Sequence, residues 1–338
     1  MNSVPATGPS GRMTVDATVV ALLDWDYGAP ATRLSQIYES AKLAQWNAST
    51  DIDWDTPVAF GSPLPEGSAY ALATYRSSPL ADRGKEGWDA FRWEVQSWMV
   101  CQFLHGEQAA LVSCARLAEV LPGVENKLCM ISQAGDEARH VEAFGRYVRE
   151  HVREPFPVTG ALQSLFKDAL VAREWEFTVL AIQCLVEPVA LAGFRLAETT
   201  FNDTLIKQIM TKVARDEARH VSFGVLLLKE VLPELTTAER ARQEEFVLDS
   251  VALLWRRFLL ADVWERLGID RTEGIGFATH SPELISYRRA LFSRVVVMLA
   301  QIGLLTPVVV AGLERLNLLD GVTMRTAERV LRRARPSG

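Results

Sequence analysis

The chain has 338 residues, of which 49% are hydrophobic and 23% are charged, with only 21 Gly and 15 Pro. This composition excludes disordered, collagen-like and low-complexity proteins and predicts a sizeable buried core. The 36 basic and 42 acidic side chains give a net charge of -6, which argues against nucleic acid as the main partner. The length allows two domains or one large one.

The N-terminal residues 1–30 are expected to form a flexible tail, whose first dozen residues lack the hydrophobic segment of a signal peptide. Four cysteines lie in apolar, helical-looking stretches without C-x-x-C spacing: Cys101, Cys114, Cys129 and Cys184. We expect reduced, packed thiols rather than disulfides or zinc ligands, and therefore a cytoplasmic protein.

Apolar residues recur at spacings of three and four through most of the chain after residue 85, whereas alternating strand patterns are scarce. The protein is therefore predicted to be all-α. A short helix is expected over 34–46, followed by an irregular segment over 54–67. The long predicted helices cover 86–121, 124–151, 174–201, 203–231 and 238–267. Proline, glycine and asparagine residues mark the breaks between them.

Residues 271–338 are expected to form a further helical extension. Within it, 295–313 carries no charged residue and approaches the roughly 20 residues that cross a bilayer. The pair Thr306-Pro307 interrupts this run and is typical of the N-cap and first position of a new helix. We therefore expect two buried helices here and no membrane span. The Arg-rich end from Arg325 is expected to be the solvated face of a last helix.

A five-residue segment of Asp, Glu, Ala, Arg and His occurs twice, at 136–140 and at 216–220. In each copy the Glu and the His are three residues apart, so both lie on one helix face and can bind one metal ion. A lone Glu-x-x-His is weak evidence. Two identical copies invite a search for partner carboxylates on the preceding helices.

Glu107 and Glu187 each precede the Glu of a repeat by 30 residues. The turn residues Pro122 and Asn202 stand halfway, 15 residues from the Glu on either side. At about 1.5 Å per residue, all four Glu therefore lie roughly 22 Å from their turns and share one level. Two helical hairpins of equal register can bring these side chains to one central layer. The predicted catalytic metal ligands are Glu107, Glu137, His140, Glu187, Glu217 and His220.

Apolar residues share the helix faces of Glu107, Glu187 and Glu217, which directs these carboxylates into the interior. A buried, unpaired carboxylate is costly, and four together would be worse. Two divalent cations would balance the four negative charges and leave both imidazoles as neutral ligands. A single charged residue on a helix is usually exposed to solvent. Surface exposure does not explain why all six predicted ligands lie at the same depth along their helices.

The Asp that opens each repeat is suited to accept the far N–H of a ligand imidazole. We predict crosswise pairing, of Asp136 with His220 and of Asp216 with His140. The arginines of the repeats can anchor this second layer, with a solvent-facing salt bridge as the alternative for each: Arg139 and Arg219.

Residues one turn from the ligands are candidates for a substrate pocket, with plain core packing as the alternative for each. They are Phe103, Ala110, Phe144, Gln183, Cys184, Leu191, Val213 and Gly224. The amide of Gln183 needs a partner, which can be a ligand carboxylate, water or substrate.

With these residues the sequence resembles the ferritin-like di-metal carboxylate superfamily. It is most similar to the oxygen-activating branch that includes ribonucleotide reductase small subunits and bacterial multicomponent monooxygenases. The resemblance rests on Glu107, Glu187 and the two repeats, covers about residues 35–265, and extends to the lead-in segment 38–54. It implies a ferritin-like four-helix bundle with a di-metal centre over 31–270, on which the extension 271–338 packs.

The resemblance further implies a non-haem di-iron oxygenase or oxidase that uses O2 to hydroxylate, N-oxygenate or desaturate a small organic substrate. The cofactor would be two iron ions, or a mixed manganese and iron pair, because carboxylate and imidazole ligands suit these redox-active metals. The sequence shows no flavin fingerprint and no iron-sulfur cysteine set, so an external reductase or ferredoxin is expected to supply electrons. A homodimer is also expected.

Two other functions remain open: a radical-generating subunit for a partner enzyme, and a metal-handling bundle. Reductase small subunits typically carry a radical Tyr one turn after the first motif's His, where this chain has Phe144. Storage ferritins are shorter than this chain, and rubrerythrins carry an added four-Cys iron site that this sequence lacks. Both comparisons disfavour the metal-handling bundle. Arylamine N-oxygenases carry an additional metal His where this chain has Val213, so a close match to those enzymes is not expected.

Overall fold

The structure is a computed structural model that describes residues 14–16, 21–25, 32–64 and 69–334. Every regular element in these ranges is a helix, which confirms the all-α prediction. Most of the predicted N-terminal tail lies outside the described residues, as does the end of the predicted irregular segment. The described part of that segment, 54–64, contains no helix.

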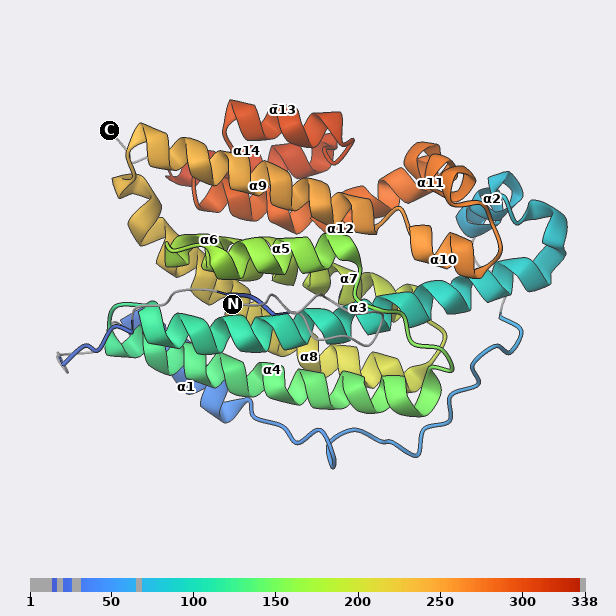
Figure 1. Cartoon of the computed structure of the whole chain (residues 1–338), viewed down its shortest axis with the longest axis horizontal. Coiled ribbons are helices and arrows are strands. Elements are labelled where there is room, and N and C mark those ends of the chain that lie inside the picture. Colours follow the sequence, from blue (N-terminus) through green and yellow to red (C-terminus); the bar gives the residue numbers. More distant parts are fainter. Residues whose placement is uncertain (1–13, 17–20, 26–31, 65–68, 335–338) are drawn as a thin grey trace.

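Four helical stretches form the central bundle (Figure 1). They are α3 (Gly84–Val120), α4 (Val124–His151), the stretch from α6 (Trp175–Val179) to α7 (Glu187–Thr200), and α8 (Thr204–Val231). α3 and α4 pack along each other as one hairpin, and α7 and α8 form a second. The predicted helices 86–121, 124–151 and 203–231 agree with these bounds to within two residues.

Local chemistry fixes both hairpin turns. Gly123 has a φ of 80°, a left-handed conformation that glycine adopts without strain. Asp203 caps α8, because its Oδ1 accepts a hydrogen bond of 2.8 Å from the backbone N–H of Ile206. The Oδ2 atom of Asp203 accepts from Gln96 on α3 at 2.8 Å and from the hydroxyl of Tyr147 on α4. The turn of the second hairpin is thereby tied to the first.

The predicted helix 174–201 is continuous but not uniformly α-helical. Leu180–Val186 is a π-helical segment that joins α6 to α7 and ends directly before Glu187. Short π-helical segments inside α-helices are frequent at functional sites. Within the described residues, 175–200 is also the one helical stretch long and apolar enough to cross a membrane, with a mean hydropathy of 1.8. Since 94% of that window is buried inside the protein, its place in the core accounts for its composition.

The predicted helix 238–267 is wrong from residue 258 onward, where the structure interrupts it. α9 spans Thr237–Arg257, and a separate α10 (Ala261–Arg266) follows after a break. Leu260, at the break, has a φ of 58°, which a right-handed helix cannot contain. The apolar periodicity hides this break because the residues that form it, 258–260, are themselves buried and hydrophobic.

The remaining helices pack around the bundle. α1 (Thr32–Leu43) ends earlier than predicted and lies against α4 and α8. α2 (Ala69–Ser77) and α5 (Gly160–Val171) are helices that the sequence analysis does not predict. In Figure 1, α9 and the C-terminal helices form a further layer along the bundle, and α12 packs directly on α7.

The C-terminal helices are α11 (Arg271–His280), α12 (Pro282–Gln301), α13 (Pro307–Arg315) and α14 (Gly321–Ala334). The predicted break in the apolar run 295–313 is confirmed, since α12 ends at Gln301 and the hydroxyl of Thr306 caps α13 by accepting from Val309 N at 3.4 Å. The boundary drawn at residue 270 between bundle and extension stays a prediction.

Candidate metal centre

Each helical stretch of the bundle contributes one Glu to a common layer, and α4 and α8 each add a His. The six side chains are Glu107 on α3, Glu137 and His140 on α4, Glu187 at the start of α7, and Glu217 and His220 on α8. All six are buried, with at most 5% of each residue exposed. The structure therefore brings together all six residues that the sequence analysis selects as metal ligands.

Their donor atoms form two overlapping groups of four, and the atoms of each group lie within 4.8 Å of one another. One group holds Glu107, Glu137, His140 and Glu217, and the other holds Glu137, Glu187, Glu217 and His220. Glu137 and Glu217 belong to both groups. Such a donor set could hold two metal ions, with Glu137 and Glu217 available to both.

The two imidazoles present one nitrogen to this cluster and the other to an aspartate. The Nδ1 atom of His140 lies 3.1 Å from Oε2 of Glu107, whereas its Nε2 atom lies 3.2 Å from Oδ2 of Asp216. The Nε2 atom of His220 lies 3.1 Å from Oδ2 of Asp136. The crosswise pairing predicted from the repeats is confirmed.

Several donor atoms of the cluster are buried without a hydrogen-bond partner among the described residues. They are Oε1 of Glu137, Oε2 of Glu187, both carboxylate oxygens of Glu217 and Nδ1 of His220. A neutral His220 ring that donates its Nε2 proton to Asp136 would carry a lone pair on Nδ1. That lone pair faces Oε1 of Glu137 at 3.1 Å. Cations between such atoms would remove the repulsion, and this donor set fits divalent iron or manganese.

Burial raises the pKa of Glu107 and of Glu187 well above the usual value, and the nearby carboxylate of Glu217 adds to both shifts. Burial lowers the pKa of His140, but hydrogen bonds to Asp216 and to the ligand carboxylates outweigh it and raise that pKa. Protons therefore compensate the charges of the cluster wherever cations do not, and metal binding must displace them.

Both arginines of the repeats bind the aspartates. Arg139 donates to Asp136, and Arg219 donates to Asp216 and, at 3.3 Å, also to Asp136. Of the two alternatives for these arginines, anchoring of the aspartate layer is therefore the one present. Trp46 adds a donor that the sequence analysis misses, because its Nε1–H binds Oδ2 of Asp216 at 2.8 Å.

Trp46 and its neighbour Gln45 follow α1 and reach the site from outside the bundle. The indole of Trp46 stacks on the imidazole of His140, with ring centroids 6.3 Å apart. Gln45 donates to Oδ1 of Asp136 at 3.2 Å and accepts from Arg139 at 2.6 Å. The only sequence signal for either residue is the resemblance of the lead-in segment.

A chain of two amides supports Glu187. Gln133 donates to Oε1 of Glu187 at 2.9 Å, and Gln183 of the π-helical segment donates to Oε1 of Gln133 at 3.3 Å. The amide nitrogen of Gln183 therefore has another amide as its partner, whereas its Oε1 has none among the described residues. The sequence analysis misses Gln133, although its place four residues before Glu137 puts it on the same helix face as the ligands.

A narrow cavity of about 30 Å³ reaches the cluster and is lined by Glu107, Glu187 and Glu217. Phe103 and Ala110, two of the predicted pocket residues, also line it. The volume suffices for about two water molecules.

The other six predicted pocket residues lie elsewhere. Phe144 packs on the rings of Phe103 and Phe194, with centroids 5.9 and 6.0 Å away. Leu191 lines an outer groove rather than the cavity. Three more are fully buried core residues: Gln183, Cys184 and Val213. Gly224 is a site of close helix contact, because a Cβ there would lie 2.5 Å from Cβ of Gln183.

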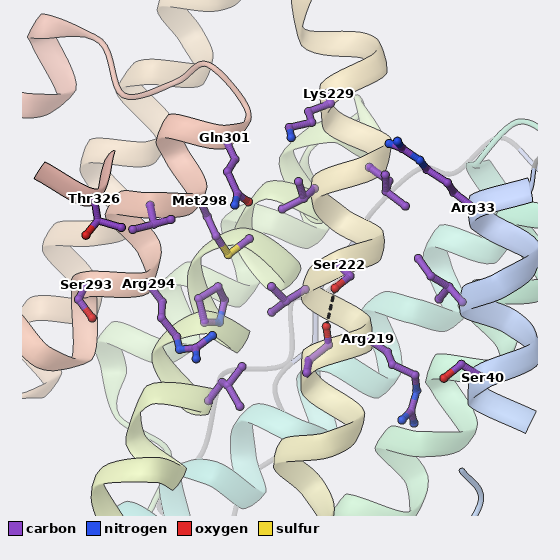
Figure 2. Close-up of a pocket in the computed structure, with 18 of the residues that line it drawn as sticks. Arg33, Ser40, Arg219, Ser222, Lys229, Ser293, Arg294, Met298, Gln301 and Thr326 are labelled. Atoms are coloured by element: carbon purple, nitrogen blue, oxygen red, sulfur yellow. Dashed lines mark hydrogen bonds between the residues drawn. The ribbon is translucent and has the colours of Figure 1, made fainter. Parts of the chain in front are cut away.

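The outer groove is open, has a volume of about 1210 Å³, and lies between α1, α8, α12 and α14 (Figure 2). Apolar and polar side chains both line it. Four cationic side chains stand around it, Arg33, Arg219, Lys229 and Arg294, and none of the described residues that line it is acidic. Arg219 is shared with the aspartate layer of the metal cluster.

Comparison with known proteins gives one family and one fold. The family model of AurF, described as P-aminobenzoate N-oxygenase, matches residues 115–303, which include both repeats and Glu187. Two solved structures of R2-like ligand-binding oxidase mutants with an anaerobically reconstituted Mn/Fe cofactor are similar. Both are 17% identical and cover 83% of this chain, with TM-scores of 0.51 and 0.52 and with 96% and 95% of their own chains covered. No curated protein matches.

Proposed function

Because the chain belongs to the AurF family of p-aminobenzoate N-oxygenases, we propose that it is a di-metal oxygenase that uses O2 to oxidise the nitrogen of a small amine. The observation that carries the proposal is the buried set of four Glu and two His, three of whose Glu line a cavity. An N-oxygenase needs both features, since the oxidant must form next to its substrate and away from bulk water.

The family match corrects one expectation of the sequence analysis. Val213 stands where arylamine N-oxygenases carry an additional metal His, and a close match to them was therefore not expected. The match to AurF overturns that expectation. Val213 is fully buried in α8 and offers no donor atom. The proposed centre of this chain accordingly has six protein ligands, one His for each metal.

In the proposed centre one ion would be held by Glu107, Glu137, His140 and Glu217, and the other by Glu137, Glu187, Glu217 and His220. Two iron ions, or one manganese and one iron, supply the redox chemistry that activates O2 when bound. The chain's own side chains hold and orient the ligands. Asp136 and Asp216 fix the imidazole tautomers, and the apolar wall that includes Phe103 limits water at the cavity.

Oxidation of an amine to a hydroxylamine puts one oxygen atom of O2 on nitrogen and releases the other as water. The balance requires two electrons and two protons from outside the substrate. We propose that an acidic electron-donor protein, such as a ferredoxin or a flavoprotein reductase, docks at the outer groove. The four cations that line the groove contrast with the net charge of -6 of the whole chain, so they can attract an acidic protein. Hydrogen bonds connect Arg219 in the groove to Asp216, and Asp216 to His140 of the proposed metal centre.

We also propose a homodimer through the exposed face of the α3–α4 hairpin. Val112, Leu128 and Ile131 are 51%, 42% and 59% exposed there, and they lie at similar distances from the hairpin turn. Exposed apolar side chains that lie together often mark a protein interface. A cytoplasmic location is part of the same proposal, supported by four free and buried cysteines.

The test of the function uses the reduced, iron-loaded protein, 4-aminobenzoate and ¹⁸O2. We expect a hydroxylamine or nitroso product that carries ¹⁸O on nitrogen, and no such product from Glu217→Ala. A stable radical signal without product would favour the radical-generating subunit. Mineralised iron without product would favour the metal-handling bundle. Either result would overturn the N-oxygenase proposal.

The donor groove has its own test. Lys229→Glu and Arg294→Glu should raise the KM for an acidic ferredoxin several-fold, more at low salt than at high salt, because they reverse charges that attract it. Reduction by dithionite should be unchanged. Arg173→Glu is the control, since Arg173 is exposed but lies outside the groove. Equal KM values for all three variants and the unmodified protein would refute the docking site.

A further inference from the structure

The two halves of the bundle repeat the same ligands but not the same surroundings. A shift of 80 residues maps Glu107 onto Glu187 and the first five-residue repeat onto the second. The same shift relates three pairs of positions, each four residues from a ligand along its helix, where the side chains differ in chemistry. These pairs are Phe103 and Gln183, Gln133 and Val213, and Phe144 and Gly224.

A pair of amides occupies the surroundings of Glu187. Gln133 donates to Oε1 of Glu187 at 2.9 Å, and Gln183 donates to Oε1 of Gln133 at 3.3 Å. Both glutamines are buried. Gly224 makes room for them, because a Cβ there would lie 2.5 Å from Cβ of Gln183. The direction of the chain follows from chemistry, since an ionised carboxylate accepts hydrogen bonds and donates none.

The corresponding surroundings in the other half are apolar. Phe103 lines the cavity beside Glu107, and its ring packs against that of Phe144 with centroids 5.9 Å apart. Val213 offers no donor. Among the described residues, Glu107 has a hydrogen-bond contact only with His140, whose Nδ1 lies 3.1 Å from Oε2 and which is itself a proposed ligand. Within that part of the chain, no side chain outside the ligand set orients Glu107.

The hydrogen bond from Gln133 restricts how Glu187 presents its carboxylate. Oε1 accepts from the amide, whereas Oε2 is buried and has no hydrogen-bond partner among the described residues. Oε2 is therefore the oxygen free to bind a cation. Because the amide is neutral, it orients the carboxylate without cancelling the charge that attracts the cation. A ligand that is already oriented loses less conformational freedom on binding, which favours affinity.

We propose that Gln133 is a positioning residue for Glu187 and makes the two ion sites unequal, so that the site of Glu187 and His220 fills first. Gln183 supports it by holding the amide of Gln133 in the orientation that donates. The inference rests on the metal centre of the proposed function. Each site has one Glu and one His of its own and the same two shared Glu, so the order of filling comes from the amides rather than from the ligands.

The experiment locates the first iron ion. The protein is crystallised under argon with one iron(II) per chain, and anomalous diffraction at the iron edge compares the two positions. The unmodified protein should show one dominant peak, beside Glu187 and His220. Gln133→Met removes the donor at a similar side-chain length, and its iron should divide between the two positions. Equal peaks in the unmodified protein, or a dominant peak beside Glu107 and His140, would overturn the proposal.

A solution measurement accompanies the crystals. In competition titration with a chelator, Gln133→Met should lower the affinity for the first iron(II) by about 10- to 100-fold. Gln133→Asn should lower it as well, because its shorter side chain keeps an amide in the core but does not reach Glu187. Gln243→Met is the matched control, since Gln243 is also buried but lies on α9, which carries none of the proposed ligands. An affinity that Gln133→Met leaves unchanged would refute the positioning role.

Neither readout needs turnover, so the two proposals can fail separately. A protein that N-oxygenates amines but fills both positions equally refutes the role of Gln133 alone. A protein that fills the Glu187 position first through Gln133 but oxidises no amine refutes the proposed function alone. A protein that takes up no iron inside the bundle refutes the metal centre on which both rest.

Discussion

Glu217 occupies the central position of the metal cluster, since it belongs to both ligand groups and neither of its oxygens has a hydrogen-bond partner among the described residues. We predict that Glu217→Ala loses both metal ions. Glu107→Ala and Glu187→Ala should each lose only the ion that their group holds. Metal analysis after anaerobic iron loading gives the content per chain. Glu142→Ala, an exposed carboxylate on α4, is the control. Two ions retained by Glu217→Ala would contradict the assignment of Glu217 to both ions.

The aspartates act through the imidazoles. Asp216 accepts from His140, Trp46 and Arg219, so its loss frees the orientation of a ligand ring. We predict that Asp216→Ala lowers iron(II) affinity by about 10- to 100-fold while the protein stays folded. Asp249→Ala, which removes an exposed carboxylate from α9, should leave the affinity unchanged. Competition titration with a chelator measures both, and equal affinities would argue against this role.

Among single residues, the sequence identifies those whose spacing along the helices places them at the same depth in the bundle. The rise of a helix is constant, so the equal spacing from Glu107 to Glu137 and from Glu187 to Glu217 translates into equal depth. Trp46 and Gln45 are not found by the same reasoning, because they follow α1, a segment with no register in common with the repeats. Their positions depend on how whole elements pack, which spacing does not contain.

Among the elements, the π-helical segment 180–186 is the least predictable from sequence. All seven of its residues are buried and all but Gln183 are apolar. Because apolar and polar residues do not alternate here, the sequence pattern does not reveal the number of residues per helical turn. Its consequence is local, because the added residue in the turn sets the direction of Glu187 at its end. The break between α9 and α10 is missed for the same reason.

Close packing of α8 on the π-helical segment gives a prediction for Gly224. A Cβ there would lie 2.5 Å from Cβ of Gln183, which is the stem of a buried side chain and cannot rotate away. Gly224→Ala should therefore reduce the free energy of unfolding by about 1–3 kcal/mol. Gly145→Ala is the control, since its Cβ would meet only Cδ1 of Leu104 at 3.8 Å. That variant should gain about 0.5–1 kcal/mol in a helix. Urea unfolding that shows the same change for both would contradict the packing described.

For the molecule as a whole, the class of fold and the order of the long helices follow from periodicity and from the turn residues between them. The short helices α2, of nine residues, and α5, of twelve, are not predicted, although α1, also of twelve residues, is. The packing of the C-terminal layer on α7 also depends on contacts between distant segments.

Metal binding should couple to the stability of the whole bundle, because one buried layer of carboxylates joins all four helical stretches. Iron(II) at about 100 times its dissociation constant should add about 2.7 kcal/mol to the free energy of unfolding. Calorimetry under argon should show a higher Tm for the loaded protein and no such shift for Glu217→Ala. A shift that persists in that variant would place the stabilising ions elsewhere.

The most direct measurement is anomalous X-ray diffraction at the iron edge from crystals of the protein loaded with iron(II). The account predicts two peaks inside the bundle, one beside Glu107 and His140 and the other beside Glu187 and His220, with Glu137 and Glu217 between them. A single peak, or iron bound only at the surface, would contradict it.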